Sequence, residues 1–166
     1  MNGAPSWLPP LVKMEDYNGE WDKYLDALHD YFVQDFVHHK PTFRSKPLSL
    51  KRHPLSYGKE ATFWHVISSG ATEEKRFVDP RRCERIRWIR AVIEHAGDPS
   101  VKVWFTNRSG ESRICLWLEE QEYLVILAER KGYLLIWTAY TVTENHRKRK
   151  LQKEFESYCR LQAPKG

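Results

Sequence analysis

Two pairs of strand-like segments follow each other in the last part of the chain. Segment 101–106 alternates polar and apolar residues before the turn 107–110, and 112–118 follows as a return strand. Segment 123–142 is rich in β-branched and aromatic residues on either side of Lys131-Gly132. Short turns containing glycine join antiparallel neighbours. The sequence therefore predicts an antiparallel meander, with strands at 101–106, 112–118, 123–128 and 133–142.

Helical patterns stand on both sides of this meander. Apolar residues recur at three- and four-residue intervals from Trp21 to Phe36, with Asn18 as a candidate N-cap. Asp79-Pro80 predicts the start of a second helix that runs to about Ala96. A last amphipathic helix, basic on one side, is expected from Glu144 to about Arg160.

Two further segments complete the predicted fold. The apolar run 63–67 is expected to be a strand that adds to the meander, and the basic, proline-containing stretch 38–58 is expected to be a loop or an extended arm. The fold class is therefore α+β, an antiparallel β-sheet of four to five strands with N-terminal helices packed on it and a basic C-terminal helix.

A chain of 166 residues is long enough for one core and short for two domains. We expect a flexible N-terminal arm at 1–17, a single domain at 18–160 and a flexible tail at 161–166. Three widely spaced cysteines fit reduced thiols. No apolar run approaches the roughly 20 residues that span a bilayer, and the start shows no signal peptide, so a cytoplasmic protein without a membrane partner is expected.

The charge of the chain predicts a polyanionic partner. Its formal net charge is +5, its isoelectric point is near 9.1, and lysine and arginine gather in segments 40–59, 81–90 and 147–153. We expect these three segments to line one concave side and to hold RNA through its phosphates.

His65 stands alone in the apolar run 63–67 and is flanked by basic segments. Its ordinary pKa near neutrality suits it to be a general acid or base. A single histidine in an apolar run is also typical of a core residue bonded to a backbone carbonyl. Both interpretations stay open on sequence alone.

Four short motifs resemble one nuclease superfamily. They are Phe63-Trp64-His65-Val66-Ile67-Ser68, the arginine-rich Arg81-Arg82-Cys83-Glu84-Arg85-Ile86-Arg87-Trp88, Tyr123-Leu124-Val125-Ile126-Leu127, and Thr138-Ala139-Tyr140. Together they resemble the phage-associated branch of the barnase, EndoU, colicin and RelE-like (BECR) nucleases, over about residues 53–158. The resemblance implies a metal-independent endoribonuclease, often a toxin or phage-encoded effector, with an immunity or antitoxin protein as a possible further partner.

Cleavage by attack of a 2′-hydroxyl needs a base, an acid and donors for the phosphoryl oxygens. His65 is the candidate acid or base, Arg81 and Arg85 are candidates to hold the phosphate, and Thr138 and Tyr140, on one face of a strand, are candidates to position the substrate. Each of these residues also fits an ordinary structural role. Further substrate-binding candidates are Arg52, Arg82, His146, Lys148 and Lys150.

Other chemistries find less support. No HxxxH, HExxH or CxxC spacing predicts a metal site, and no cofactor motif is present. The alternative function is a non-catalytic RNA-binding or phage accessory protein that uses tryptophans such as Trp64 and Trp137 for stacking. An exposed His65 in a basic cleft near Thr138, Tyr140 or Arg85 favours cleavage, whereas a buried His65 favours binding alone.

Overall fold

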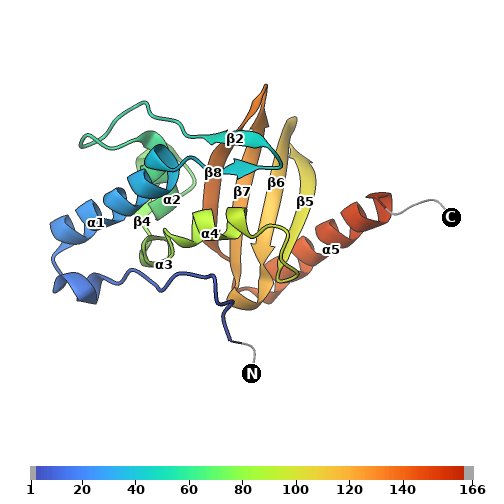
Figure 1. Cartoon of the computed structure of the whole chain (residues 1–166), viewed down its shortest axis with the longest axis horizontal. Coiled ribbons are helices and arrows are strands. Elements are labelled where there is room, and N and C mark those ends of the chain that lie inside the picture. The colour runs from blue at the N-terminus through green and yellow to red at the C-terminus, as the bar shows by residue number, and fades with distance from the viewer. Residues whose placement is uncertain (1–2, 163–166) are drawn as a thin grey trace.

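The computed structural model describes residues 3–162 and shows an α+β fold built on a curled sheet (Figure 1). The predicted meander is confirmed. Its four strands, β5 (Val101–Arg108), β6 (Glu111–Leu118), β7 (Tyr123–Arg130) and β8 (Tyr133–Thr141), pair antiparallel in sequence order. Both turns lie where the sequence places them, and Ser109, Gly110 and Gly132 have the positive φ of tight turns, 53°, 78° and 85°.

The prediction of a purely antiparallel sheet of four to five strands is wrong, because two short strands lie within 38–58. The sheet is mixed and has six strands in the order β1-β2-β8-β7-β6-β5. Strands β1 (Thr42–Phe43) and β2 (Lys46–Ser49) form a small hairpin, and β2 runs parallel to β8. Prolines are tolerated in strands at a sheet edge, which is where this hairpin lies.

The run that contains His65 is a helix, so the expected fifth antiparallel strand is also wrong. Helix α2 (Ala61–Ile67) buries Phe63, Val66 and Ile67. These positions have the i, i+3, i+4 spacing of one helix face, which a run of only five apolar residues does not distinguish from a buried strand. Residues 51 and 52 accept hydrogen bonds from the first amides of α2 through their carbonyl oxygens.

The other helices follow the sequence in part. Asp79 caps α3 (Pro80–Glu84), and its side chain accepts a hydrogen bond from the Arg81 amide at 3.0 Å. The expected single helix is interrupted, because Arg85 leaves helical geometry and α4 (Trp88–Glu94) begins afterwards.

The first helix begins later than its predicted cap. Glu20, and not Asn18, precedes α1 (Trp21–Val33), which continues into η2 (Gln34–His38). The remaining elements are η1 (Met14–Tyr17), β3 (Ser68–Ser69), η3 (Glu73–Lys75), β4 (Phe77–Val78), η4 (Glu119–Gln121) and α5 (Asn145–Gln162).

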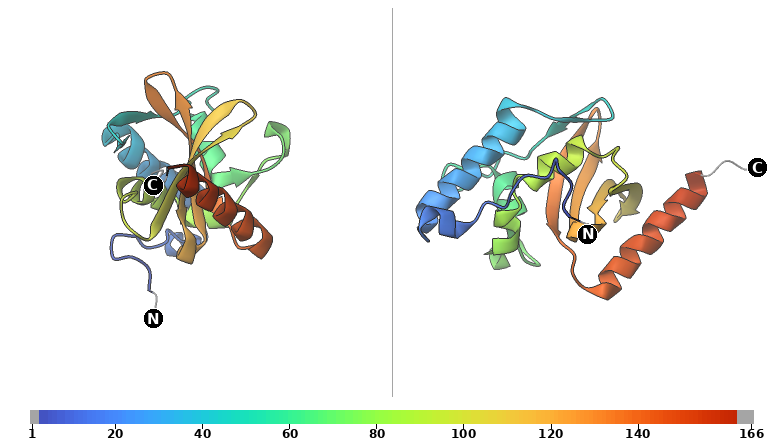
Figure 2. Two further views of the ribbon diagram at one scale, coloured as in Figure 1. Left: turned by 90° about the vertical axis from the view of Figure 1, so that its right-hand side faces the viewer. Right: turned by 60° about the horizontal axis from the view of Figure 1, so that its bottom comes forward.

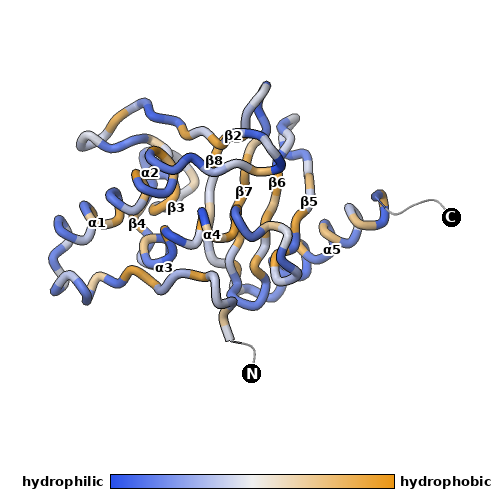
Figure 3. The backbone as a smooth tube through the Cα atoms, in the orientation of Figure 1, coloured by the Kyte–Doolittle hydropathy of each residue, from blue (hydrophilic) through white to orange (hydrophobic). Residues whose placement is uncertain are grey.

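Each face of the sheet has its own core. One face packs against α1 to α4 around residues such as Leu116 and Val125, which are fully buried. The other face packs against α5, where Leu151 meets Trp104 and Trp117. Figure 2 shows α5 standing apart from the other helices, and in Figure 3 its backbone is mostly hydrophilic with a few hydrophobic positions. No helix among residues 3–162 is long and apolar enough to cross a membrane.

The described part of the N-terminal segment lies along α3 and α4. The Trp88 indole donates a hydrogen bond to the Pro9 carbonyl at 2.8 Å, and the Val12 amide donates to the Glu84 carbonyl at 2.9 Å. Trp7 stacks on His95 with ring centroids 4.3 Å apart. These contacts join the segment expected as an arm to the helical layer.

Replacing Gly70 tests the hairpin of β3 and β4. A Cβ atom there would overlap the Lys75 carbonyl oxygen and lie 2.8 Å from the Arg76 Cα, and φ is +154°. Gly70→Ala should therefore lower the free energy of unfolding by about 1–3 kcal/mol in urea denaturation. Gly97→Ala is the control, because nothing lies within 4 Å of its added Cβ. Equal stability of the two variants would contradict the close approach at Gly70.

Candidate functional site

The candidate site lies along the half of β8 that β2 leaves uncovered. Strand β2 pairs only with Leu134 and Leu135, and beyond them α2 and α3 pack against β8. This packing brings residues 61–67, 80–84 and 136–140 together, although they are far apart in the sequence. Three of the four motifs that carry the nuclease resemblance therefore meet at one sheet edge.

Arg82 lies at the centre of this edge. Its Nη1 donates to Thr138 Oγ1 at 3.1 Å and to the His65 carbonyl at 3.4 Å, and its guanidinium carbon lies 5.3 Å from the centre of the Tyr140 ring. Burial lowers the pKa of Arg82, while the negative charge of Asp79 acts in the opposite direction. One side chain thus connects α3, the end of α2 and β8.

A β-bulge sets the direction of the β8 side chains. Ile126 pairs with Thr138 but Leu127 pairs with Ile136, which leaves Trp137 as the extra residue. Ile136 and Ala139 then both enter the core under α1 to α4, while Tyr140 joins the α5 side. Thr138, two residues before Tyr140, also contacts Arg82.

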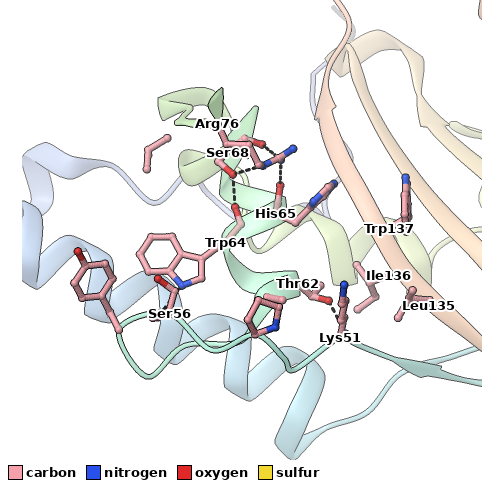
Figure 4. Close-up of a pocket in the computed structure, with 14 residues that line it drawn as sticks. Lys51, Ser56, Thr62, Trp64, His65, Ser68, Arg76, Leu135, Ile136 and Trp137 are labelled. Carbon is pink, nitrogen blue, oxygen red and sulfur yellow. Dashed lines mark hydrogen bonds between the residues drawn. The ribbon is translucent and has the colours of Figure 1, made fainter. Parts of the chain in front are cut away.

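His65 lines a pocket of about 630 Å³ between α2, the loop before it, and β8 (Figure 4). Its side chain is partly exposed, and its ring lies 5.8 Å from the Trp137 ring at an angle of 47°. Lys51 and Arg76 line the same pocket, and Trp64 and Tyr57 supply aromatic surface in it. The His65 ring is therefore partly exposed in a pocket beside Trp137 and is not fully buried.

Sequence reasoning missed Arg76, which lies between η3 and β4. Its Nε donates to Ser68 Oγ at 3.0 Å, and its Nη2 donates to the Ser68 and His65 carbonyls at 2.6 and 3.0 Å. These carbonyls end α2 and lack helical partners, which is why cations are favoured there. From the sequence, Arg76 is only one basic residue in a loop after the histidine motif, and nothing there indicates which groups it bonds.

Tyr140 lies among positive charges. Burial raises the pKa of its hydroxyl above the ordinary value, and the charges of Arg108, Arg147 and Arg82 act in the opposite direction. The phenol therefore keeps its proton at neutral pH and can donate a hydrogen bond. Arg113 also stacks over Trp137 at 4.4 Å, so the strand face beside the pocket is cationic and aromatic.

The two arginines proposed to hold phosphate lie in α3 and directly after it. Arg81 is exposed on α3, and its carbonyl accepts a hydrogen bond from Arg85 at 3.1 Å. The Arg85 guanidinium lies 5.1 Å from the centre of the Trp88 ring. Within this motif, Arg82 is the arginine that bonds to the His65 carbonyl and to the Thr138 side chain.

The other predicted binding residues are dispersed. His146 is exposed and lies 3.1 Å from a Glu144 carboxylate oxygen, Lys148 pairs with Glu122, and Lys150 is exposed on α5. Arg52 is exposed in the loop before α2. Since α5 and α3–α4 cover opposite faces of the sheet, the three basic segments do not line one concave side, and that prediction is wrong.

Within residues 3–162 no group of three histidines, cysteines or carboxylates is arranged to hold a metal ion. Comparison with protein-family models, with curated proteins and with solved structures found no match for this chain. The site therefore has to be interpreted from its own geometry, and the nuclease resemblance stays a prediction.

Replacing Thr138 tests the Arg82 bridge. Thr138→Val removes the oxygen that accepts from a largely buried guanidinium, and hydrogen bonds to charged groups contribute about 1.5–3 kcal/mol. We expect a loss of that order in the free energy of unfolding, measured in urea. Thr138→Ser keeps the oxygen and should cost clearly less. If the serine variant is as unstable as the valine variant, the hydrogen bond does not hold this edge together.

Proposed function

We propose that this protein is a metal-independent endoribonuclease that cleaves RNA at the β8 edge. The observation that carries the proposal is that Arg82 bonds to the His65 carbonyl and to Thr138 and contacts the Tyr140 ring, next to a pocket that His65, Lys51 and Arg76 line. A titratable ring next to cations and hydroxyls is the chemical set that 2′-hydroxyl attack requires.

In the proposed reaction the 2′-oxygen forms a bond to the adjacent phosphorus, and the bond from phosphorus to the 5′-oxygen breaks. His65 performs one of the two proton transfers, from the 2′-hydroxyl or to the departing 5′-oxygen, and water performs the other. The protonated Tyr140 hydroxyl donates to a phosphoryl oxygen, and the nearby guanidiniums offset the developing charge. Arg82 is a positioning residue, since its guanidinium contacts the His65 carbonyl, Thr138 and Tyr140.

A non-catalytic RNA-binding protein is the second candidate, and one observation favours it. Thr138 already accepts a hydrogen bond from Arg82, and the Tyr140 ring already contacts the same guanidinium. Two of the proposed substrate-positioning groups thus have structural roles. A toxin or phage-effector role, a phage accessory role and an immunity or antitoxin partner come from the resemblance alone.

Cleavage is tested with purified protein and total RNA in EDTA. The parent should release fragments that end in 2′,3′-cyclic phosphate, because no metal-bound water takes part in the attack. His65→Ala should lower the rate by about 10²- to 10⁴-fold, the usual effect of losing a general acid or base. Gel electrophoresis and end-group analysis give both readouts.

His38→Ala is the matched control, since His38 is exposed at the end of η2 and does not line the pocket. It should cleave at the parental rate. Cleavage by His65→Ala at the parental rate would remove His65 from the mechanism. A parent that leaves RNA intact while still binding it would support the second candidate.

A further inference from the structure

The pocket beside His65 extends well beyond the residues that the proposed cleavage uses. At about 630 Å³ it lies within the range of roughly 300–1,000 Å³ that is usual for small-molecule sites. Its walls come from the loop before α2, from α2 itself and from β8. The pocket is therefore large enough to hold a group that is bigger than the reacting phosphate and hydroxyl.

One wall of the pocket is a fixed aromatic surface. The Trp64 indole donates a hydrogen bond from Nε1 to the Ser56 carbonyl at 2.9 Å and packs edge-on against Phe63, with centroids 5.5 Å apart. These contacts hold the indole in place before any ligand binds. Trp64 points into the space between the loop and the helix in Figure 4. Such a platform suits a flat ring that stacks.

Tyr57 adds a second ring at the mouth. It is 87% exposed, although it is aromatic, and its ring centre lies 6.1 Å from that of Trp64. A tight turn presents it, in which Ser56 and Lys59 exchange backbone hydrogen bonds of 3.0 and 2.9 Å. The two rings are tilted by 58°, so a ligand at the mouth would meet both.

The polar part of the pocket is positive. Lys51 and Arg76 line it, and none of its described lining residues is an aspartate or a glutamate. Arg76 is held by its bonds to Ser68 and His65, so its charge has a fixed place. Aromatic rings combined with fixed cations match a ligand that has both a planar ring and an anionic group.

We infer that this pocket binds one unpaired nucleotide of an RNA strand, with its base against Trp64 and Tyr57 and its phosphate beside Lys51 or Arg76. This inference deepens the proposed function and rests on it for the position of the cleaved bond. Because His65 and Trp137 line the same pocket, the bound nucleotide lies next to the reacting phosphate. Bases within a duplex are stacked and cannot enter, so the substrate is single-stranded.

The test uses a fluorescein-labelled strand of 2′-O-methyl nucleotides, which cannot be cleaved because its 2′-oxygens carry no proton. Affinity is measured by fluorescence anisotropy for this strand alone and for the same strand annealed to its complement. The parent should bind the single strand at least about 10-fold more tightly. Loss of one stacking side chain typically weakens binding about 5- to 150-fold, and we expect this range for Tyr57→Ala and Trp64→Ala.

Trp64→Phe keeps a stacking ring and should bind more tightly than Trp64→Ala. Trp21→Ala is the control for the loss of a partly exposed indole, since Trp21 lies on α1 outside the pocket lining, and it should bind like the parent. Tyr57 is so exposed that its replacement leaves the fold intact, which keeps the test valid if Trp64→Ala does not fold.

The inference is overturned if Tyr57→Ala and a folded Trp64→Ala both bind like the parent, or if duplex and single strand bind equally. Selective binding by a parent that leaves ordinary RNA intact would support the pocket and refute the proposed cleavage. Cleavage without selective single-strand binding would refute the pocket and leave the cleavage standing.

Discussion

The contacts of the Arg82 guanidinium hold the site together. Arg82 is largely enclosed by protein, and a guanidinium in that position must be hydrogen-bonded or paired to offset the loss of water. Its partners are Thr138 Oγ1, the His65 carbonyl and, at 3.8 Å, an oxygen of Asp79, which also caps α3. Arg82 therefore links α2, α3 and β8 at the border of the core that they share, and the place of the His65 ring depends on how these elements pack.

The shortness of β2 makes room for this arrangement. A sheet edge exposes unpaired backbone groups, and proteins commonly cover such edges with a helix or a loop. Here β2 covers only the start of β8, and α2 and α3 pack against the remainder. The bulge at Trp137 lies at that point of the strand, directly before Thr138, which accepts the Arg82 hydrogen bond. Bulges often change the direction of a side chain beside functional sites.

The sequence predicted the elements that local interactions determine. The two hairpins of the meander, the Asp79 cap and the amphipathic α5 follow from turn residues, capping and periodicity within a few residues. It did not predict the parallel pairing of β2 with β8. This pairing joins residues 48 and 134, which are so far apart in the sequence that no local residue pattern indicates it. The run 63–67 was also assigned wrongly, because so short an apolar run fits a strand or a helix equally well.

The same limit applies to the site. His65, Thr138 and Tyr140 were singled out from the sequence, and the structure places them at one sheet edge. Choosing among the arginines of α3 requires knowledge of which face of the helix meets β8, and that depends on the break at Arg85 and on the packing of α2. Arg76 reaches the site only through the fold of the β3–β4 hairpin, which no spacing in the sequence indicates.

The central claim is that RNA meets this protein at the β8 edge and not on the more basic helix α5. Backbone amide chemical shifts of the ¹⁵N-labelled protein, followed during titration with an uncleavable RNA strand, test this claim most directly. The account predicts the largest shifts in residues 51–68, 76–82 and 136–140. Shifts confined to α5 and β5, with the β8 edge unchanged, would contradict it.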